Sequence, residues 1–221
     1  MVTTIARQVR PVKVTFIEEV STGHYVFGFS RDFGFTAGQV VGISPEKQGP
    51  RRLYSICSGE NDPQVQILFN VIKEGYLSPL LAELKPGDTV WITEPRGEFT
   101  GRPGPAVWIA TGTGIAPFYS MFRSGLAEGK ILIHGNRYLE QFHFYDEFSS
   151  LMGTNYIRCC TAEWDERVYP GRVTGFLAER TVLDPAVNYY LCGSAEMVVD
   201  TRDLLIGRGI PYNRILSEIY F

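Results

Sequence analysis

Two glycine-containing segments lie where a strand-like apolar run meets a helix-like run, and both could hold phosphate. The first is Thr111-Gly112-Thr113-Gly114-Ile115-Ala116-Pro117, and the second is Leu191-Cys192-Gly193-Ser194. Glycines let the backbone approach a ligand closely, and free N–H groups at the start of a helix attract negative charge. The spacing GxGxxP departs from GxGxxG. A tight turn without a ligand and a plain buried Cys192 are therefore the competing interpretations.

A second group of candidates includes residues of the first half of the chain. Strand alternation would put Arg52 and Tyr54 of Arg52-Leu53-Tyr54-Ser55 on one face, where the guanidinium could hold a phosphate and the ring could lie against another ring. Ser78 before Pro79 predicts the N-cap of a helix, which could bind a further phosphate or be an ordinary cap. Two aromatic residues, Tyr220 and Phe221, are the last in the sequence and are available for stacking.

The elements that must position the first-half candidates are strands. The expected strands are Val12–Val20, His24–Phe29, Val40–Ile43, Leu53–Cys57 and Val65–Ile72, separated by Gly, Pro, Asn and Asp clusters. Short strands with such turns predict an antiparallel barrel or sandwich, interrupted here by the one helix after Ser78.

The second half alternates strands with helices. The expected strands are Ala106–Ala110, Ile131–His134, Tyr156–Cys160, Tyr189–Cys192 and Ile215–Phe221, and the expected helices are Ile115–Phe122, Leu139–Leu151, Thr174–Arg180 and Ala195–Ile206. This alternation predicts a parallel sheet with helices on both faces. The Gly- and Pro-rich stretch Gly97–Pro105 separates the halves, so we expect domains at residues 1–100 and 101–221.

Composition narrows the class of protein. The 221 residues carry a net charge of -3, which argues against a nucleic-acid partner. The uncharged stretch Pro103–Phe122 is too rich in Pro, Gly, Ser and Thr to cross a membrane, and the first residues lack the apolar core of a signal peptide. A cytoplasmic protein is therefore expected. The four cysteines form no CxxC pair, which argues against a zinc ribbon and a thioredoxin-type site, and no metal site is expected. Cys159 and Cys160 should face opposite sides of a strand, the alternative being a vicinal redox pair.

Taken together, these segments and their order resemble the ferredoxin–NADP reductase family, most closely its short bacterial ferredoxin/flavodoxin reductase branch. The resemblance covers nearly the whole chain and implies an FAD-binding β-barrel followed by an NAD(P)-binding α/β domain. It implies FAD contacts from Arg52, Leu53, Tyr54, Ser55, Leu68, Phe69, Asn70, Val71, Tyr76, Leu77, Ser78, Thr113, Tyr220 and Phe221. It implies NAD(P) contacts from Gly112, Gly114, Ile115, Pro117, Arg137, Thr161, Gly193, Ser194 and Met197.

The resemblance also implies four catalytic residues. Ser55 would hydrogen-bond near the hydride-accepting nitrogen of the flavin, and Cys192 and Glu218 would flank the nicotinamide. Tyr220 would cover the flavin ring, while Phe221 would stack on the adenine. The expected activity is that of a monomeric FAD-dependent oxidoreductase passing electrons between NAD(P)H and a ferredoxin or flavodoxin. The alternatives are the reductase component of an oxygenase, a free-flavin reductase, or a non-catalytic subunit that keeps the fold.

One departure from the family leaves the choice of coenzyme open. Members of that bacterial branch carry an Arg in an SRE or TRE motif that binds the 2′-phosphate of NADP, and the matching segment here is Thr161-Ala162-Glu163. Arg137 matches another arginine on the phosphate side, and Arg167 or Arg172 could substitute for the missing one. We expect both NADPH and NADH to be used, with a slight preference for NADPH.

Overall fold

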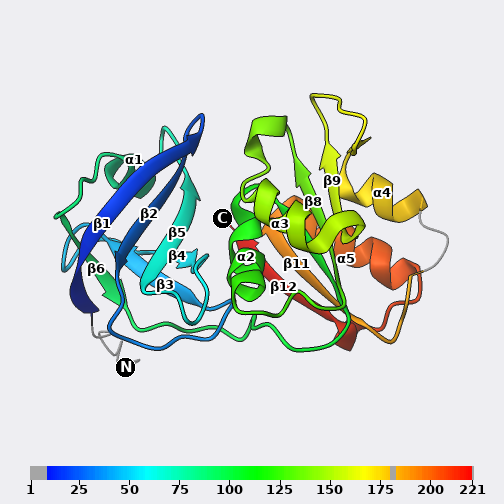
Figure 1. The fold of residues 1–221 in the computed structure, drawn as a ribbon, viewed down its shortest axis with the longest axis horizontal. Coiled ribbons are helices and arrows are strands. Elements are labelled where there is room, and N and C mark those ends of the chain that lie inside the picture. The colour runs from blue at the N-terminus through cyan, green and yellow to red at the C-terminus, as the bar shows by residue number, and fades with distance from the viewer. Residues whose placement is uncertain (1–8, 180–182, 221) are drawn as a thin grey trace, which may run out of the picture. The chain divides into compact units, whose positions relative to one another are not determined.

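The computed structural model describes residues 9–179 and 183–220, and the predicted contact of Phe221 lies outside them. The chain divides into two compact units, the first ending at Thr100 and the second beginning at Gly101 (Figure 1).

The first unit is an antiparallel β-barrel. Its strands are β1 (Val9–Ser21), β2 (His24–Ser30), β3 (Val40–Ser44), β4 (Arg52–Ser55), β5 (Gln64–Asn70) and β6 (Thr89–Thr93). They pair in the order β4-β3-β6-β1-β2-β5. The residues after β4 close the ring, because Ile56 bridges Ile67 and the Cys57 amide donates to the Gln66 carbonyl at 2.9 Å. Closure leaves few exposed strand edges and confirms the predicted barrel.

Aromatic and branched side chains fill the barrel. Phe27, Phe29, Phe69, Ile43 and Ile92 are all buried in one cluster. The helix α1 (Leu77–Ala82) adds the buried side chains of Leu77 and Leu81 to this cluster. The helix begins earlier than predicted, so Ser78 is not its N-cap. The Ser78 hydroxyl instead accepts a hydrogen bond from the Ile72 amide at 2.9 Å and fixes the turn before the helix.

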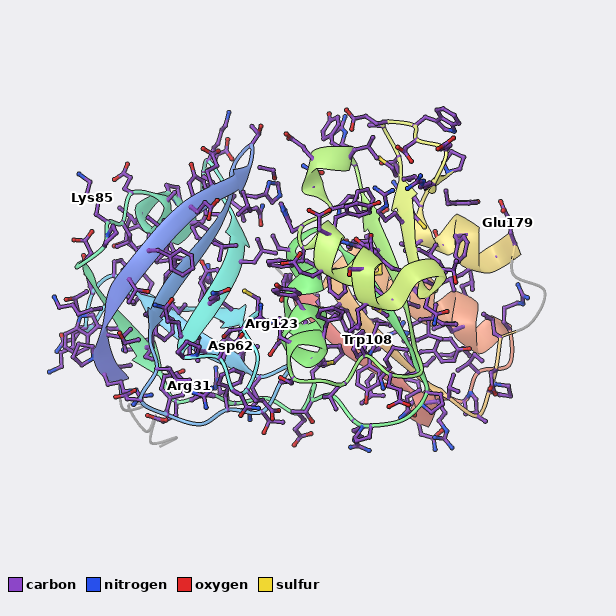
Figure 2. All side chains as sticks on the ribbon, viewed as in Figure 1. Arg31, Asp62, Lys85, Trp108, Arg123 and Glu179 are labelled. Atoms are coloured by element: carbon purple, nitrogen blue, oxygen red, sulfur yellow. The ribbon has the colours of Figure 1, made fainter. Side chains whose placement is uncertain are left out.

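A single arginine ties two loops of the barrel together. Arg31 Nε donates to the Phe33 carbonyl at 2.8 Å, and its Nη1 donates to the carbonyls of Glu60 and Asp62, the latter at 3.1 Å. Figure 2 shows Arg31 and Asp62 near each other on the first unit. These hydrogen bonds fix the loop that links β4 to β5. The two strands carry several of the candidate residues.

The second unit is a parallel sheet covered by helices on both faces. Its strands are β7 (Ala106–Thr111), β8 (Lys130–Asn136), β9 (Tyr156–Cys160), β10 (Val168–Pro170), β11 (Asn188–Ser194) and β12 (Ile215–Tyr220). Its α-helices are α2 (Ala116–Arg123), α3 (Tyr145–Met152), α4 (Val173–Glu179) and α5 (Ala195–Gly207), and its short 3₁₀ helices are η1 (Gly112–Ile115), η2 (Leu139–Gln141), η3 (Gly153–Asn155) and η4 (Tyr212–Arg214). The strand order is β10-β9-β8-β7-β11-β12, which confirms the predicted α/β class.

The two faces of this sheet have separate cores. Cys159 packs with Ile109 and Ile133 beneath α4 and α5, whereas Cys160 packs with Phe142 and Val168. The two cysteines therefore lie on opposite faces, as predicted, and their thiols are buried and form no disulfide.

Among the described residues, none of the helices has the length and apolar character that a membrane span requires.

The structure also differs from the sequence-based elements in one further helix and in two strands. The predicted helix Leu139–Leu151 is broken into η2 and α3, because Phe144 has a left-handed φ of 62° and stacks on the Tyr119 ring with centroids 3.6 Å apart. The strands β6 and β10 were not predicted. β10 has only three residues and ends in Pro170, so it carries almost no local pattern.

Candidate functional site

Two glycines bring the loops after β7 and β11 into direct contact. A Cβ on Gly114 would overlap the carbonyl oxygen of Cys192 and lie 2.8 Å from the Cα of Gly193. A Cβ on Gly193 would overlap Oγ1 of Thr111. Chain order reverses between β7 and β11, and ligands of open α/β sheets bind at such a point. The bare backbone cradle therefore fits the phosphates of a dinucleotide.

The helices that follow these loops present their amino ends at the same edge of the sheet. Helix α2 has Pro117 in its first turn and no side-chain cap, so side chains do not occupy its first amides. Helix α5 is capped by Ser194, whose hydroxyl accepts a hydrogen bond from the Met197 amide at 3.3 Å. Ser194, predicted to contact NAD(P), thus also has a structural role.

Cys192 lies beside the two predicted catalytic residues of β12. Parallel pairing places Cys192 opposite Glu218 and Ser194 opposite Tyr220. The thiol is fully buried, and this burial raises its pKa well above the usual value. The charge of Glu218 adds to the rise, while a hydrogen bond with the Tyr220 side chain opposes it. The thiol is therefore neutral at physiological pH and is suited to contacting a ring rather than to nucleophilic attack.

The loops after β8 and β9 are joined by backbone hydrogen bonds. The Thr161 amide donates to the Asn136 carbonyl at 3.1 Å, and the Ala162 amide donates to the Arg137 carbonyl at 3.0 Å. Arg137 is exposed. Arg137 and Ala162, which the family resemblance associates with the 2′-phosphate, are thus adjacent in the fold.

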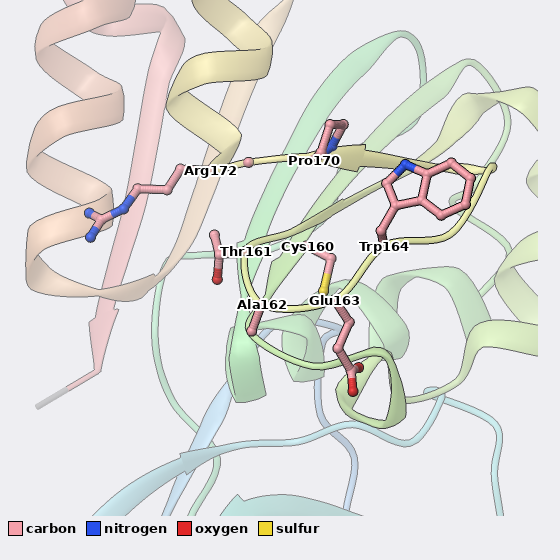
Figure 3. Close-up of a pocket in the computed structure, with 8 residues that line it drawn as sticks. Cys160, Thr161, Ala162, Glu163, Trp164, Pro170 and Arg172 are labelled. Carbon is pink, nitrogen blue, oxygen red and sulfur yellow. The ribbon is translucent and has the colours of Figure 1, made fainter.

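A pocket of about 390 Å³ opens at this edge of the sheet (Figure 3). It is lined by Cys160, Thr161, Ala162, Glu163, Trp164, Pro170, Gly171 and Arg172. The Glu163 carboxylate is held by the Leu139 amide at 2.5 Å, and the Arg172 guanidinium forms an ion pair with Glu196 at 2.7 Å. Arg167 is not among the lining residues and lies 3.9 Å from Glu166. Of the two substitutes suggested for the missing arginine, only Arg172 reaches the pocket.

The barrel unit carries its candidates on β4 and β5. Arg52 is exposed, and no described residue forms an ion pair with it, so its guanidinium is available to a phosphate. The Tyr54 ring meets the Phe69 ring edge to face with centroids 6.2 Å apart. Burial raises the pKa of Tyr54 to about 12, against the opposing charge of Arg52. Ser55 is buried at the end of the strand.

Further barrel candidates surround this strand. Leu68 and Phe69 are buried on β5, whereas Asn70 is exposed. Leu53 and Tyr76 are large apolar side chains with more than half of their surface exposed, 53% and 55%. An exposed guanidinium beside flat and apolar side chains is the donor set that a flavin nucleotide requires, so the barrel residues fit FAD.

The structure thus gathers the predicted residues into one group in each unit. The barrel holds Arg52, Leu53, Tyr54, Ser55, Leu68, Phe69, Asn70, Val71, Tyr76, Leu77 and Ser78. The α/β unit holds Gly112, Thr113, Gly114, Ile115, Pro117, Arg137, Thr161, Cys192, Gly193, Ser194, Met197, Glu218 and Tyr220. The expected contacts of Thr113 and Tyr220 with FAD stay predictions.

Near these groups, Trp164 was missed from the sequence, and Thr111 was quoted in the first glycine segment without being given a contact. Thr111 presents its hydroxyl to Gly193, and Trp164 lines the pocket after β9 with 72% of its surface exposed. A tryptophan among Glu163, Asp165 and Glu166 is a signal that could have found Trp164, since an isolated aromatic ring in a polar loop is available to a ligand.

These two folds and their sites define a flavin- and nicotinamide-dependent oxidoreductase. Residues 11–100 match the model of the oxidoreductase FAD-binding domain, and residues 108–203 match that of the oxidoreductase NAD-binding domain. The chain belongs to the ferredoxin–NADP reductase family.

Individual relatives cover most of the chain. Ferredoxin–NADP reductase B of Sorangium cellulosum (strain So ce56) is 31% identical over 96% of this chain and 94% of its own length. The flavodoxin/ferredoxin–NADP reductase of Escherichia coli (strain K12) is 31% identical over 84% of this chain and 72% of its own. The solved ferredoxin NADP+ reductase from Neisseria gonorrhoeae with bound FAD and NADP superimposes with a TM-score of 0.87. It is 25% identical to this chain, and the match covers 96% of this chain and 99% of that one.

Proposed function

We propose that this flavoprotein passes electrons between NAD(P)H and a ferredoxin or flavodoxin. The observation that carries the proposal is the 31% identity to a ferredoxin–NADP reductase over 96% of this chain and 94% of the relative. The two residue groups support it, because one fits a flavin nucleotide and the other fits a dinucleotide. We expect the protein to act as a monomer in the cytoplasm, which light scattering and cell fractionation would test.

Individual residues then take the following roles. Bound FAD supplies the ability to accept a hydride and release electrons singly. Arg52 would hold the FAD pyrophosphate by its fork of donors, and the Tyr54 ring would orient the flavin. Ser55 would donate a hydrogen bond close to the hydride-accepting position. The neutral thiol of Cys192 and the carboxylate of Glu218 would orient the nicotinamide ring, and Tyr220 would yield its place to that ring.

For the coenzyme, we propose use of both NADPH and NADH with a slight preference for NADPH. Arg172 lines the pocket after β9, the Arg137 carbonyl accepts a hydrogen bond from the amide of the lining residue Ala162, and the Ala162 side chain contributes no charge. Arg172 is engaged by Glu196, so its charge is partly neutralised before a phosphate arrives. In this arrangement, Arg137→Ala should lower the NADPH/NADH ratio and leave the NADH kinetics nearly unchanged.

Stopped-flow reduction of the purified flavoprotein by NADPH and by NADH tests this function. We expect both coenzymes to bleach the flavin absorbance, and the reduced enzyme to pass electrons to added ferredoxin or flavodoxin in a cytochrome c assay. A protein that binds no flavin, or whose flavin neither coenzyme reduces, would contradict the proposal.

A second candidate is the reductase component of an oxygenase. The toluate 1,2-dioxygenase electron transfer component of Pseudomonas putida is 29% identical over 80% of this chain, although the match covers 56% of that relative. The same electron-transfer assay separates the two candidates. Faster reduction of an oxygenase component than of any ferredoxin or flavodoxin would favour the second, and rapid reduction of free FMN would indicate a flavin reductase.

A further inference from the structure

A buried histidine lies beneath the loops at the carboxyl edge of the parallel sheet. His134, on β8, is fully buried. Its Nδ1 lies 3.1 Å from the Tyr156 hydroxyl, and its Nε2 lies 3.0 Å from Nδ2 of Asn136. The backbone of Gly112 lies near enough to the ring to oppose the lowering of its pKa, and the Phe142 ring meets it edge to face. The imidazole is therefore satisfied on both of its nitrogens.

The surroundings of His134 include two of the loops that carry coenzyme candidates. Gly112 opens the loop after β7, and Asn136 ends β8. Nδ2 of Asn136 donates to the Gln141 carbonyl at 2.9 Å as well as facing the histidine, so Nε2 of His134 accepts. The carbonyl of Asn136 in turn accepts from the Thr161 amide after β9. His134 thus contacts the end of β8 directly, lies near the start of the loop after β7, and is linked to the loop after β9 through the backbone of Asn136.

The surroundings keep this ring neutral. Burial lowers the pKa of His134 to about 3, and the neighbouring His143 and Arg158 disfavour a second positive charge. Arg158 lies over the Tyr145 ring at 4.2 Å and is 3.8 Å from Asp165, so its charge is held in place on the same face of the sheet. A neutral imidazole keeps both a donor and an acceptor, which a protonated ring would not.

We infer that His134 is a positioning residue for the nicotinamide coenzyme. Its side chain holds the Gly112 loop and the Arg137 loop at a fixed position relative to each other. The inference rests on the proposed function, because it concerns binding of the same coenzyme. It assigns His134 no contact with the reacting atoms. Loss of the ring would let the two loops relax independently and would weaken coenzyme binding without disturbing the barrel.

Three variants of His134 test the inference. The amide of His134→Gln can reach the Nε2 position and keep the Asn136 bond, and that of His134→Asn can keep the Tyr156 bond, whereas His134→Leu keeps neither. We expect His134→Leu to raise KM for NADPH and the Kd for NADP+ by about tenfold, the equivalent of about 1.4 kcal/mol. The glutamine variant should recover most of this loss, and kcat and FAD content should change little.

A pair of tyrosine variants controls for general destabilisation. Tyr156→Phe removes the hydroxyl that faces His134, whereas Tyr189→Phe removes a buried hydroxyl at the opposite edge of the same sheet, where it donates to the Asp184 carbonyl at 3.2 Å. Hydrogen exchange of the amides at 112–115 should accelerate in Tyr156→Phe and in His134→Leu, but not in Tyr189→Phe. This readout needs no turnover and remains usable if one variant folds poorly.

The outcomes separate the two levels of the argument. If neither coenzyme reduces the wild-type flavin, the proposed function fails and this inference fails with it. If the wild type is reduced normally but His134→Leu keeps the wild-type KM, Kd and exchange rates, the inference alone is overturned. Equal losses in Tyr156→Phe and Tyr189→Phe would also overturn it, since a merely structural role predicts them.

Discussion

Replacing Ala162 with arginine should shift coenzyme choice toward NADPH. Ala162 is exposed and lines the pocket after β9, so a longer side chain needs no new cavity. The Ala162 amide donates to the Arg137 carbonyl at 3.0 Å, so an arginine at position 162 would extend from backbone next to Arg137. The neighbouring Glu163 carboxylate is engaged by the Leu139 amide, which limits its ability to neutralise the new charge.

The size of the effect follows from one added contact. A hydrogen bond to a charged group contributes about 1.5–3 kcal/mol, and each ~1.4 kcal/mol is a factor of ten in binding. Repulsion from Arg137 reduces the gain, so we expect a rise of about tenfold in the ratio of kcat/KM for NADPH to that for NADH. Most of the change should lie in KM for NADPH.

The assay is steady-state diaphorase activity with both coenzymes for the wild type, Ala162→Arg and a control. Ala186→Arg is a matched control, because it adds the same charge at an exposed alanine before β11, at the other edge of the sheet. An unchanged ratio in Ala162→Arg, or an equal shift in Ala186→Arg, would refute the placement of Ala162 at the 2′-phosphate. A wild-type NADPH/NADH ratio above ~10³ is larger than a protein that lacks one hydrogen bond to the 2′-phosphate should show. Such a ratio would mean that Arg172 already supplies that contact.

Four further results are expected. Ser55→Ala should retain FAD but slow single-turnover flavin reduction by ~10²-fold; equal rates would remove the residue from catalysis. Deleting Tyr220 and Phe221 should speed FAD release and tighten NADP+ binding, both measurable by fluorescence, and unchanged affinities would make these rings ordinary surface groups. Gly114→Ala should abolish coenzyme binding while the flavin stays bound, because its Cβ would overlap the carbonyl of the neighbouring strand; a wild-type Kd would contradict the contact. Finally, the pKa of His134 is about 3 in the folded state and about 6.5 in the unfolded state, so between these pH values only the unfolded chain binds the proton. The free energy of unfolding should therefore fall by ~1.4 kcal/mol for each pH unit below 6.5. Urea titrations of His134→Gln should show a flatter pH dependence than the wild type; parallel curves would refute this.

The regular elements were largely predictable because their patterns are local. The period-two runs of the barrel and the strand–turn–helix segments of the second unit follow from hydrophobic patterning and glycine placement alone. The break at Phe144 could not be predicted in this way, because its left-handed backbone is accompanied by a ring stack with Tyr119 on another helix. Tertiary packing overrides helix propensity there.

The candidate site shows the same division. Candidate residues in contiguous motifs, such as Arg52 and Gly112, can be predicted from their spacing and stay predictions. His134 was not, because a lone histidine in an apolar strand has no distinguishing sequence pattern, and its partners are adjacent only after the sheet has formed. Ser78 likewise could not be placed from the sequence, because the helix begins one residue earlier, at Leu77, and the turn brings the Ile72 amide to the Ser78 hydroxyl.

The contact between Gly114 and Gly193 also limits how this protein can be engineered. Neither glycine leaves space for even one methyl group, because the two loops pack directly against each other. A chimera that borrows the loop after β7 from a relative would retain the native loop after β11 and meet a mismatched neighbour. The two segments should therefore be exchanged as a pair, together with Thr111, and a graft of either one alone should yield a protein with a loaded barrel and an inactive coenzyme domain.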